Sequence, residues 1–225
     1  MTINELYEKM IQIFDSNSIR LEKPSMIEIE ENQNQGKDKF KKLCVRCDNQ
    51  CIVVKDCLLK NSNNTFSADK QLKLNKECDK ILITDLEGEK VVFIFELKST
   101  FSKGLEAGIP QLRASCFKLH VFLNCIDAFL FDEYKFRAVL ALWKPTIEQV
   151  LQITKEQYLG EVSDRKKLMI EVFDHDVVHS VIDRSRSEAY YSLPIKSEYK
   201  YDVPLSLFTT DYNNQTANVD LSKIL

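Results

Sequence analysis

Three charged residues in the middle of the chain carry side chains that suit chemistry at a phosphate group: Asp79, Glu96 and Lys98. Two carboxylates can share one divalent cation, because hard cations such as Mg²⁺ prefer oxygen ligands. An ammonium group beside them can stabilise negative charge that develops on a phosphate, or help to activate a water molecule. This chemistry requires a fold that brings the three side chains together.

The sequence around these residues predicts two neighbouring β-strands. Residues 79–85 and 90–98 have strand-like composition, and Leu86-Glu87-Gly88-Glu89 between them is typical of a hairpin turn. The run from Val91 to Phe95 is apolar on both faces, which predicts a central, buried strand. A carboxylate and an ammonium at the end of such a strand are costly to bury unless they have partners.

The register of this hairpin decides whether the three side chains meet. If Leu86 lies opposite Glu89, the numbers of paired residues sum to 175. Asp79 is then directly opposite Glu96, and the Cβ atoms of directly opposed residues are about 5 Å apart. Side chains alternate along a strand, so Lys98 faces the same side as Glu96. Two carboxylates at this spacing repel each other, and a divalent cation between them removes the repulsion.

Asp79, a hairpin, the tripeptide Glu96-Leu97-Lys98 and a following helix together resemble the PD-(D/E)XK nuclease superfamily, over roughly residues 70 to 143. The resemblance implies an α-β-β-β-α-β core and Mg²⁺- or Mn²⁺-dependent hydrolysis of nucleic-acid phosphodiesters. It also implies that Asp79 and Glu96 bind the metal and that Lys98 is the catalytic lysine. Cys78 stands where the motif has proline, which contributes no ligand.

Two further positions complete the site that the resemblance implies. Some members carry a glutamine on the helix after the lysine strand, and Gln111 lies in the matching place. Many members also have an acidic residue on the first core helix. We choose Glu8, on an amphipathic helix predicted over residues 3–15, with Glu28 and Glu30 as alternatives.

The helix after the lysine strand is predicted to begin at Pro110, a favoured first helical position, after a loop that contains Gly104 and Gly108. One of its faces is polar and could follow a phosphate backbone. The residues of this face are Gln111, Ser115 and Lys118.

The remaining patterns predict an α/β fold in which helices flank a mixed central β-sheet. The resemblance implies that this fold has a restriction-endonuclease-like core. We expect one nuclease domain over residues 1–225, with a core over about 1–145 and a C-terminal extension over about 146–225. The tail from Thr209 is weakly specified. Strands are predicted over 26–30, 45–59, 136–143, 168–173, 189–195 and 203–208, and a further helix over 147–158.

Two other groups have the residue types of a metal site. The first is a cysteine group, in which the first pair has zinc-like spacing but a second such pair is missing. Its members are Cys44, Cys47, Cys51 and Cys57. The second is His175 with His179, which we interpret as ordinary surface histidines, whereas His120 is predicted to be packed in an apolar helix.

Two basic groups are candidates for contact with a nucleic-acid backbone, although solvated surface is the simpler interpretation. One combines the segment 183–186 with Tyr190 and Tyr191. The other contains Lys37, Lys39, Lys41 and Lys42.

The composition limits the classes of function. The chain has 225 residues and a formal net charge of −3, so it has no overall attraction to nucleic acid. No apolar run is long enough to span a membrane, and the N-terminus does not resemble a signal peptide. We therefore expect a cytoplasmic protein whose seven cysteines stay reduced.

The resemblance implies a magnesium-dependent nuclease that hydrolyses DNA, with RNA as an alternative substrate. Because the net charge is weak and no phosphate-binding glycine loop is present, we expect an effector subunit of a multi-subunit restriction or antiphage defence complex. One alternative is a non-catalytic nucleic-acid-binding or scaffold module that keeps the nuclease fold. Another is a small zinc-binding interaction protein that uses the cysteine group.

Overall fold

The computed structural model describes residues 1–31, 40–60, 74–157, 164–182, 196–200, 202–212 and 214–225. The α-helices in these ranges are α1 (Ile3–Ile13), α2 (Asp56–Lys60), α3 (Phe101–Leu123), α4 (Ile147–Gln157) and α5 (Asp164–Asp174). The strands are β1 (Ile19–Glu22), β2 (Met26–Glu30), β3 (Lys42–Arg46), β4 (Cys51–Val54), β5 (Lys80–Leu86), β6 (Glu89–Lys98), β7 (Tyr134–Trp143), β8 (Val177–Ile182), β9 (Val203–Thr210) and β10 (Thr216–Asp220).

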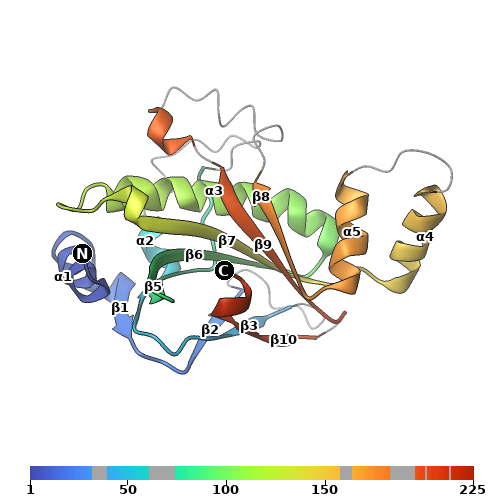
Figure 1. Cartoon of the computed structure of the whole chain (residues 1–225), viewed down its shortest axis with the longest axis horizontal. Helices are drawn as coiled ribbons and strands as arrows, with labels where there is room; N and C mark the ends of the chain where they lie inside the picture. Colours follow the sequence, from blue (N-terminus) through green and yellow to red (C-terminus); the bar gives the residue numbers. More distant parts are fainter. Residues whose placement is uncertain (32–39, 61–73, 158–163, 183–195, 201, 213) are drawn as a thin grey trace.

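A seven-stranded sheet in the order β1-β4-β5-β6-β7-β9-β8 forms the centre of the molecule (Figure 1). β5 and β6 pair antiparallel, whereas β6, β7 and β9 run parallel, so the sheet is mixed. β6 has three strands on either side, as its continuous apolar run predicts. The predicted α/β class with a mixed central sheet is confirmed.

The two faces of this sheet are covered by different elements. Helix α3 runs along one face, and a smaller sheet in the order β10-β3-β2 covers the other (Figure 1). The side chains of β6 alternate between the two layers. Val92 and Ile94 belong to the core under α3, whereas Phe93 and Phe95 belong to the core against the smaller sheet.

The sequence interpretation was wrong for three segments. The single strand predicted over 45–59 is divided among β3, β4 and α2. The segment 168–173, predicted as a strand, lies inside helix α5, and the tail from Thr209 includes strand β10, which pairs in parallel with β3. In each case, contacts with distant parts of the chain override weak local preference. The strand predicted over 189–195 lies outside the described residues.

The start of α3 also differs from the prediction. The helix begins at Phe101 rather than Pro110, so Gly104 and Gly108 are helical instead of part of a loop. Glycine is a poor helix former, which is why the pattern favoured a loop. A Cβ atom at Gly104 would lie 2.5 Å from Cδ2 of Leu142, and one at Gly108 would lie 2.6 Å from Cδ1 of Leu140. The two glycines therefore let α3 lie close against β7.

The C-terminal part of the chain contributes to both sheets. β8 and β9 complete one end of the seven-stranded sheet, and β10 is a strand of the smaller sheet. Helices α4 and α5 lie beside each other at one end of the molecule, and α1 lies at the opposite end (Figure 1). In the part of the chain that the structure describes, no helix has the length and apolar character needed to cross a membrane.

Candidate active site at the end of strand β6

The hairpin of β5 and β6 has the predicted register, with Leu86 paired to Glu89 and Lys80 paired to Phe95. Counted from the turn, Lys80 and Phe95 form the last pair, so Asp79 lies one residue beyond the paired region. The backbone N–H of Asp79 donates a hydrogen bond to the carbonyl oxygen of Phe95, at 2.9 Å.

Beyond the last backbone pair, the Asp79 carboxylate forms the next contact with β6. Its Oδ2 atom accepts a hydrogen bond of 2.7 Å from the backbone N–H of Leu97, in β6. A side-chain oxygen thus occupies the place that a strand carbonyl would fill. This contact fixes the Asp79 carboxylate beside the last residues of β6.

The predicted residues Asp79, Glu96, Lys98 and Gln111 line one small pocket, which we call the Asp79 pocket. Its volume of about 10 Å³ is enough for about one water-sized guest. The complete lining consists of Glu31, Glu77, Cys78, Asp79, Glu96, Lys98 and Gln111.

Glu96 is the most buried carboxylate of the pocket, with only 1% of its surface exposed. Its Oε1 atom forms an ion pair with Nζ of Lys98, whereas Oε2 has no hydrogen-bond partner among the described residues. Burial, and then the negative charge of Asp79, raise the pKa of Glu96 from 4.5 to about 8, against the opposing effect of Lys98. The uncharged form is therefore favoured at neutral pH unless a further positive charge enters the pocket.

Lys98 responds to the same surroundings. Burial opposes its charged form, but the charge of Glu96 and the hydrogen bond to it are stronger together, so the pKa of Lys98 is raised. The charges of Asp79 and Glu31 act in the same direction. The pocket therefore holds protons more tightly than these groups do in water, as expected for a buried site with an excess of carboxylates.

A further acidic residue of the Asp79 pocket is Glu31, which the sequence interpretation did not consider. Glu31 follows the last residue of β2, and its backbone N–H donates to the carbonyl oxygen of Lys41, at 3.0 Å. Its side chain lines the Asp79 pocket, and its charge raises the pKa of both Glu96 and Lys98. The sequence contained one signal for Glu31: it directly follows the alternating segment that forms β2, and a residue just after a strand can leave the alternating pattern.

The structure does not bring the predicted Glu8 to this pocket. Glu8 is exposed on α1. The chain start that leads into α1 pairs with Glu133, which also pairs with Lys90 in the second position of β6, at the end of the strand away from Lys98. The alternatives Glu28 and Glu30 are exposed and form ion pairs with Lys42.

The polar face of α3 is not available to a phosphate backbone, contrary to the sequence interpretation. Gln111, Ser115 and Lys118 are buried, and each forms a hydrogen bond with the chain just before Asp79. Gln111 donates from Nε2 to the carbonyl oxygen of Glu77, at 3.3 Å. It therefore contacts protein backbone at the edge of the pocket.

The residues of the Asp79 pocket fit a divalent cation in their chemistry. The ligands would be carboxylate oxygens, one buried Glu96 oxygen has no hydrogen-bond partner among the described residues, and the volume suits one ion. A preformed ligand set is not present: no three His, Cys, Asp or Glu side chains in the described ranges are arranged so that they could hold a metal. Cation binding would therefore require these carboxylates to rearrange.

The cysteine group does not form a metal centre among the described side chains. Cys44, Cys47 and Cys51 are buried thiols, and the side chain of Cys57 lies outside the described residues. A hydrogen bond with Cys51 lowers the pKa of Cys47 to about 7.

The histidines and basic groups give no second site among the described residues. His175 and His179 are exposed, and His179 contacts the hydroxyl of Ser206 at 3.0 Å. His120 is buried and stacks on Phe131, as expected for a packed residue, and burial lowers its pKa to about 4. The segment 183–186, Tyr190, Tyr191, Lys37 and Lys39 lie outside the described residues.

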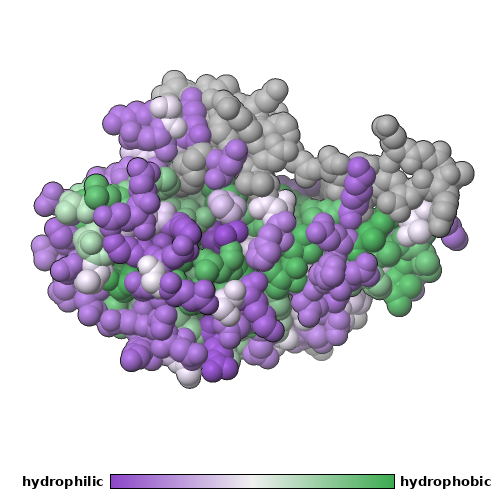
Figure 2. All heavy atoms as spheres, in the orientation of Figure 1, coloured by the Kyte–Doolittle hydropathy of each residue, from purple (hydrophilic) through white to green (hydrophobic). Residues whose placement is uncertain are grey.

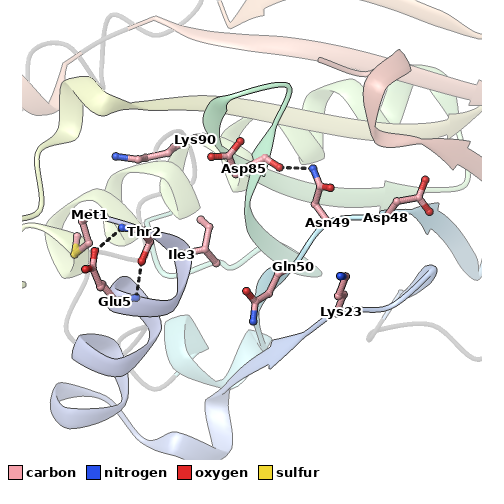
Figure 3. Close-up of a pocket in the computed structure, with 10 residues that line it drawn as sticks. All are labelled: Met1, Thr2, Ile3, Glu5, Lys23, Asp48, Asn49, Gln50, Asp85 and Lys90. Atoms are coloured by element: carbon pink, nitrogen blue, oxygen red, sulfur yellow. Dashed lines mark hydrogen bonds between the residues drawn. The ribbon is translucent and has the colours of Figure 1, made fainter.

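A larger cleft of about 690 Å³ lies near the turn of the hairpin, at the other end of β6 (Figure 3). Four of its lining residues bond to each other in two pairs. Thr2 and Glu5 cap helix α1, and Nδ2 of Asn49 donates to the carbonyl oxygen of Asp85. Acidic and basic side chains are mixed, and none of the predicted site residues is present. The cleft is lined by Met1, Thr2, Ile3, Glu5, Lys23, Asp48, Asn49, Gln50, Asp85 and Lys90.

Comparisons of the chain with protein-family models, with curated proteins and with solved structures found no match. The functional assignment therefore depends on the residues of the Asp79 pocket and on their geometry.

Proposed function

We propose that this protein is a Mg²⁺- or Mn²⁺-dependent nuclease that hydrolyses DNA phosphodiester bonds at the Asp79 pocket. The observation that carries the proposal is the buried Glu96, which shares the pocket with Asp79 and Lys98 and has one oxygen without a hydrogen-bond partner among the described residues. A buried carboxyl group next to a second carboxylate is costly to fold. A bound cation would offset this cost, because its positive charge attracts both carboxylates.

Four residues of the pocket have a definite part in this proposal. Asp79 and Glu96 hold the cation, and Glu31 takes the place that we first gave to Glu8. The cation, when bound, would polarise the scissile phosphate and lower the pKa of the attacking water. Lys98, no longer needed as the counter-ion of Glu96, turns its ammonium group toward the substrate phosphate and stabilises its developing charge.

The order of elements supports the same assignment. The PD-(D/E)XK resemblance implies an α-β-β-β-α-β core, and α1, β4, β5, β6, α3 and β7 follow one another in this order. Among the described residues, β1–β3, α2 and two short 3-10 helices are inserted between them. Asp79 comes just before the second of these three consecutive strands, and Glu96 and Lys98 end the third.

The test is a cleavage assay on DNA and RNA, with Mg²⁺, Mn²⁺ or EDTA present. Lys98→Ala should lower the cleavage rate by about 100-fold or more, because the lysine stabilises charge in the transition state. Lys90→Ala is the matched control, since Lys90 is also an ion-paired lysine of β6 but lies outside the pocket. Equal cleavage by wild type and Lys98→Ala would overturn the assignment.

The role of Glu31 has its own test. Glu31→Gln should weaken activation by Mn²⁺, whereas Glu28→Gln, which changes an exposed glutamate of the neighbouring strand, should not. If Glu8→Gln were the damaging change instead, the third carboxylate would be the one that we first selected.

We further propose that the chain acts as the nuclease subunit of a larger assembly, such as a restriction or antiphage defence complex. The net charge of −3 gives the chain no overall attraction to DNA, so a partner would supply DNA loading or sensing. Rapid cleavage of DNA by the purified protein alone, at physiological salt, would contradict this dependence.

A non-catalytic binding module is the second candidate. The observation that favours it is the Glu96–Lys98 ion pair, which gives the Glu96 carboxylate a counter-charge without a cation. Under this alternative, the protein binds nucleic acid equally well in EDTA and in Mg²⁺, and no cleavage appears with either ion.

A further inference from the structure

The chain that leads into Asp79 is held by helix α3. Residues 76–78 have no regular secondary structure, so their backbone groups have no strand ladder to join. The side chain of Lys118 donates to the carbonyl oxygen of Lys76, at 2.5 Å. The backbone N–H of Cys78 donates to the hydroxyl of Ser115, at 2.8 Å.

Gln111 adds a third contact to this segment, because its side chain donates a hydrogen bond to the carbonyl oxygen of Glu77, between Lys76 and Cys78. Gln111, Ser115 and Lys118 are four and three residues apart, so they stand in one row along α3. Buried backbone groups outside secondary structure need partners, and here three helix side chains supply them for three consecutive residues. We call this row the α3 clamp.

The same row of α3 continues to the other half of the pocket. Gly108 and Gly104 extend it toward the helix start with the same spacing. A Cβ atom at Gly108 would lie 3.6 Å from Cγ of Glu96, and one at Gly104 would lie 3.0 Å from Cβ of Lys98. One helix face therefore lies close to Glu96 and Lys98 and also holds the chain before Asp79.

A lysine side chain is energetically unfavourable at the buried position of Lys118. It is completely buried, and burial lowers its pKa to about 8, although Glu77 and Cys78 act in the opposite direction. A buried ammonium that is used to hold a backbone carbonyl costs more than an apolar side chain of the same length. The hydrogen bond from Lys118 to the carbonyl oxygen of Lys76, rather than apolar packing, therefore explains why a lysine occupies this position.

We propose that Ser115 and Lys118 are positioning residues: through the backbone of residues 76–78, they set where the Asp79 carboxylate stands for cation binding. This inference rests on the proposed function, because it assigns the Asp79 carboxylate to a cation. Asp79 is fixed at two other points, by Phe95 and by Leu97. The clamp supplies the third support, on the side where β5 has no further pairs.

The test uses Ser115→Ala and Lys118→Met, with Leu123→Ala as the control. Leu123 is a fully buried residue near the end of the same helix, outside the clamp and the pocket, so its truncation destabilises the fold without touching residues 76–78. Ser115→Ala removes only one oxygen atom, so it serves if the lysine variant fails to fold.

The first readout is hydrogen exchange of the Leu97 amide, which donates to Asp79, measured relative to the Ile94 amide of the same strand. This ratio corrects for a general loss of stability. We expect it to rise by about ten-fold in both clamp variants and to stay constant in Leu123→Ala. An unchanged ratio in both clamp variants would overturn the proposal.

The second readout is Mn²⁺ affinity, measured by calorimetry without nucleic acid. We expect a loss of about 10-fold to 100-fold in the clamp variants, the range typical of residues that support metal ligands. Wild-type affinity in variants with a raised Leu97 ratio would overturn the positioning role. If the wild type itself binds no Mn²⁺, the proposed function fails, and the Leu97 ratio alone decides whether the clamp holds Asp79.

Discussion

The buried carboxyl group of Glu96 gives the most direct prediction about this protein. In the folded chain its pKa is raised to about 8, compared with 4.5 in the absence of the pocket. Between these two values, the unfolded chain releases the proton and the folded chain keeps it. The free energy of unfolding therefore falls as the pH rises from 4.5 to 8, and it levels off above 8.

The size of this effect follows from the two pKa values. One pH unit corresponds to about 1.4 kcal/mol, so Glu96 should remove about 3 to 4 kcal/mol of stability between pH 5 and pH 8. In Glu96→Gln the side chain stays neutral at every pH and resembles the protonated glutamate. The variant should match the wild type near pH 5 and be more stable by about this amount at pH 8.

The assay is urea denaturation at pH 5, 6.5 and 8 in EDTA, for wild type, Glu96→Gln and the exposed control Glu8→Gln. Other carboxyl groups also titrate, so the informative quantity is the difference between each variant and the wild type at each pH. Addition of Mg²⁺ at pH 8 should stabilise the wild type by about 3 kcal/mol at a concentration 100 times the dissociation constant, and should not stabilise Glu96→Gln.

Two results would refute this reasoning. If the stability difference between Glu96→Gln and wild type is the same at pH 5 and pH 8, the pocket does not shift the titration of Glu96. If Glu8→Gln shows the same pH-dependent difference, the effect belongs to the net charge of the chain and not to the pocket.

Three further predictions concern the pocket and its helix. Mn²⁺ affinity should rise by about ten-fold from pH 6 to pH 7, because a proton on Glu96 competes with the ion, and calorimetry at the two pH values measures this. Gly104→Ala should destabilise the fold by about 1 to 3 kcal/mol and also slow cleavage, because the added Cβ meets Leu142 and Lys98; equal cleavage at matched folded fraction would contradict it. Gly88→Ala, at a φ of +83° with no atom within 4 Å of the added Cβ, should cost about 1 to 2 kcal/mol in denaturation while cleavage stays unchanged.

The surface of the molecule is largely hydrophilic in the orientation of Figure 1, with apolar side chains showing most from the middle toward the end where α4 and α5 lie (Figure 2). Helix α4 lies at this end of the molecule (Figure 1), and its exposed apolar residues Ile147 and Leu151 are at helical spacing. The Asp79 pocket, by contrast, is narrow, and Lys98 in its lining has a side chain that is 20% exposed. Under the proposed function, a substrate phosphate would approach the pocket beside Lys98.

The hairpin that carries the site was predictable because its signals are local. A glycine turn fixed the register from Leu86 and Glu89, and an uninterrupted apolar run placed β6 in the centre of the sheet. Alternation along a strand then put Glu96 and Lys98 on one face. These inferences need only residues that are near each other in the sequence, where backbone geometry determines the outcome.

The remaining parts of the site depend on contacts between distant segments. Glu31 reaches the pocket because β2 belongs to the smaller sheet, whose partner β10 comes from the far end of the chain. Glycines that disfavour a helix locally are accepted in α3 because the helix must lie close to β7.

The sequence by itself determined the strand, the turn and the chemical types of the central residues. Only the tertiary structure decided which third carboxylate joins them, and which side of α3 faces inward. The polar row of Gln111, Ser115 and Lys118 has the pattern of a solvent-exposed face, yet it is buried against residues 76–78. The physical reason is that a polar row on a helix can form hydrogen bonds either with water or with a buried, irregular backbone. The spacing of the polar residues along the sequence is the same in both cases.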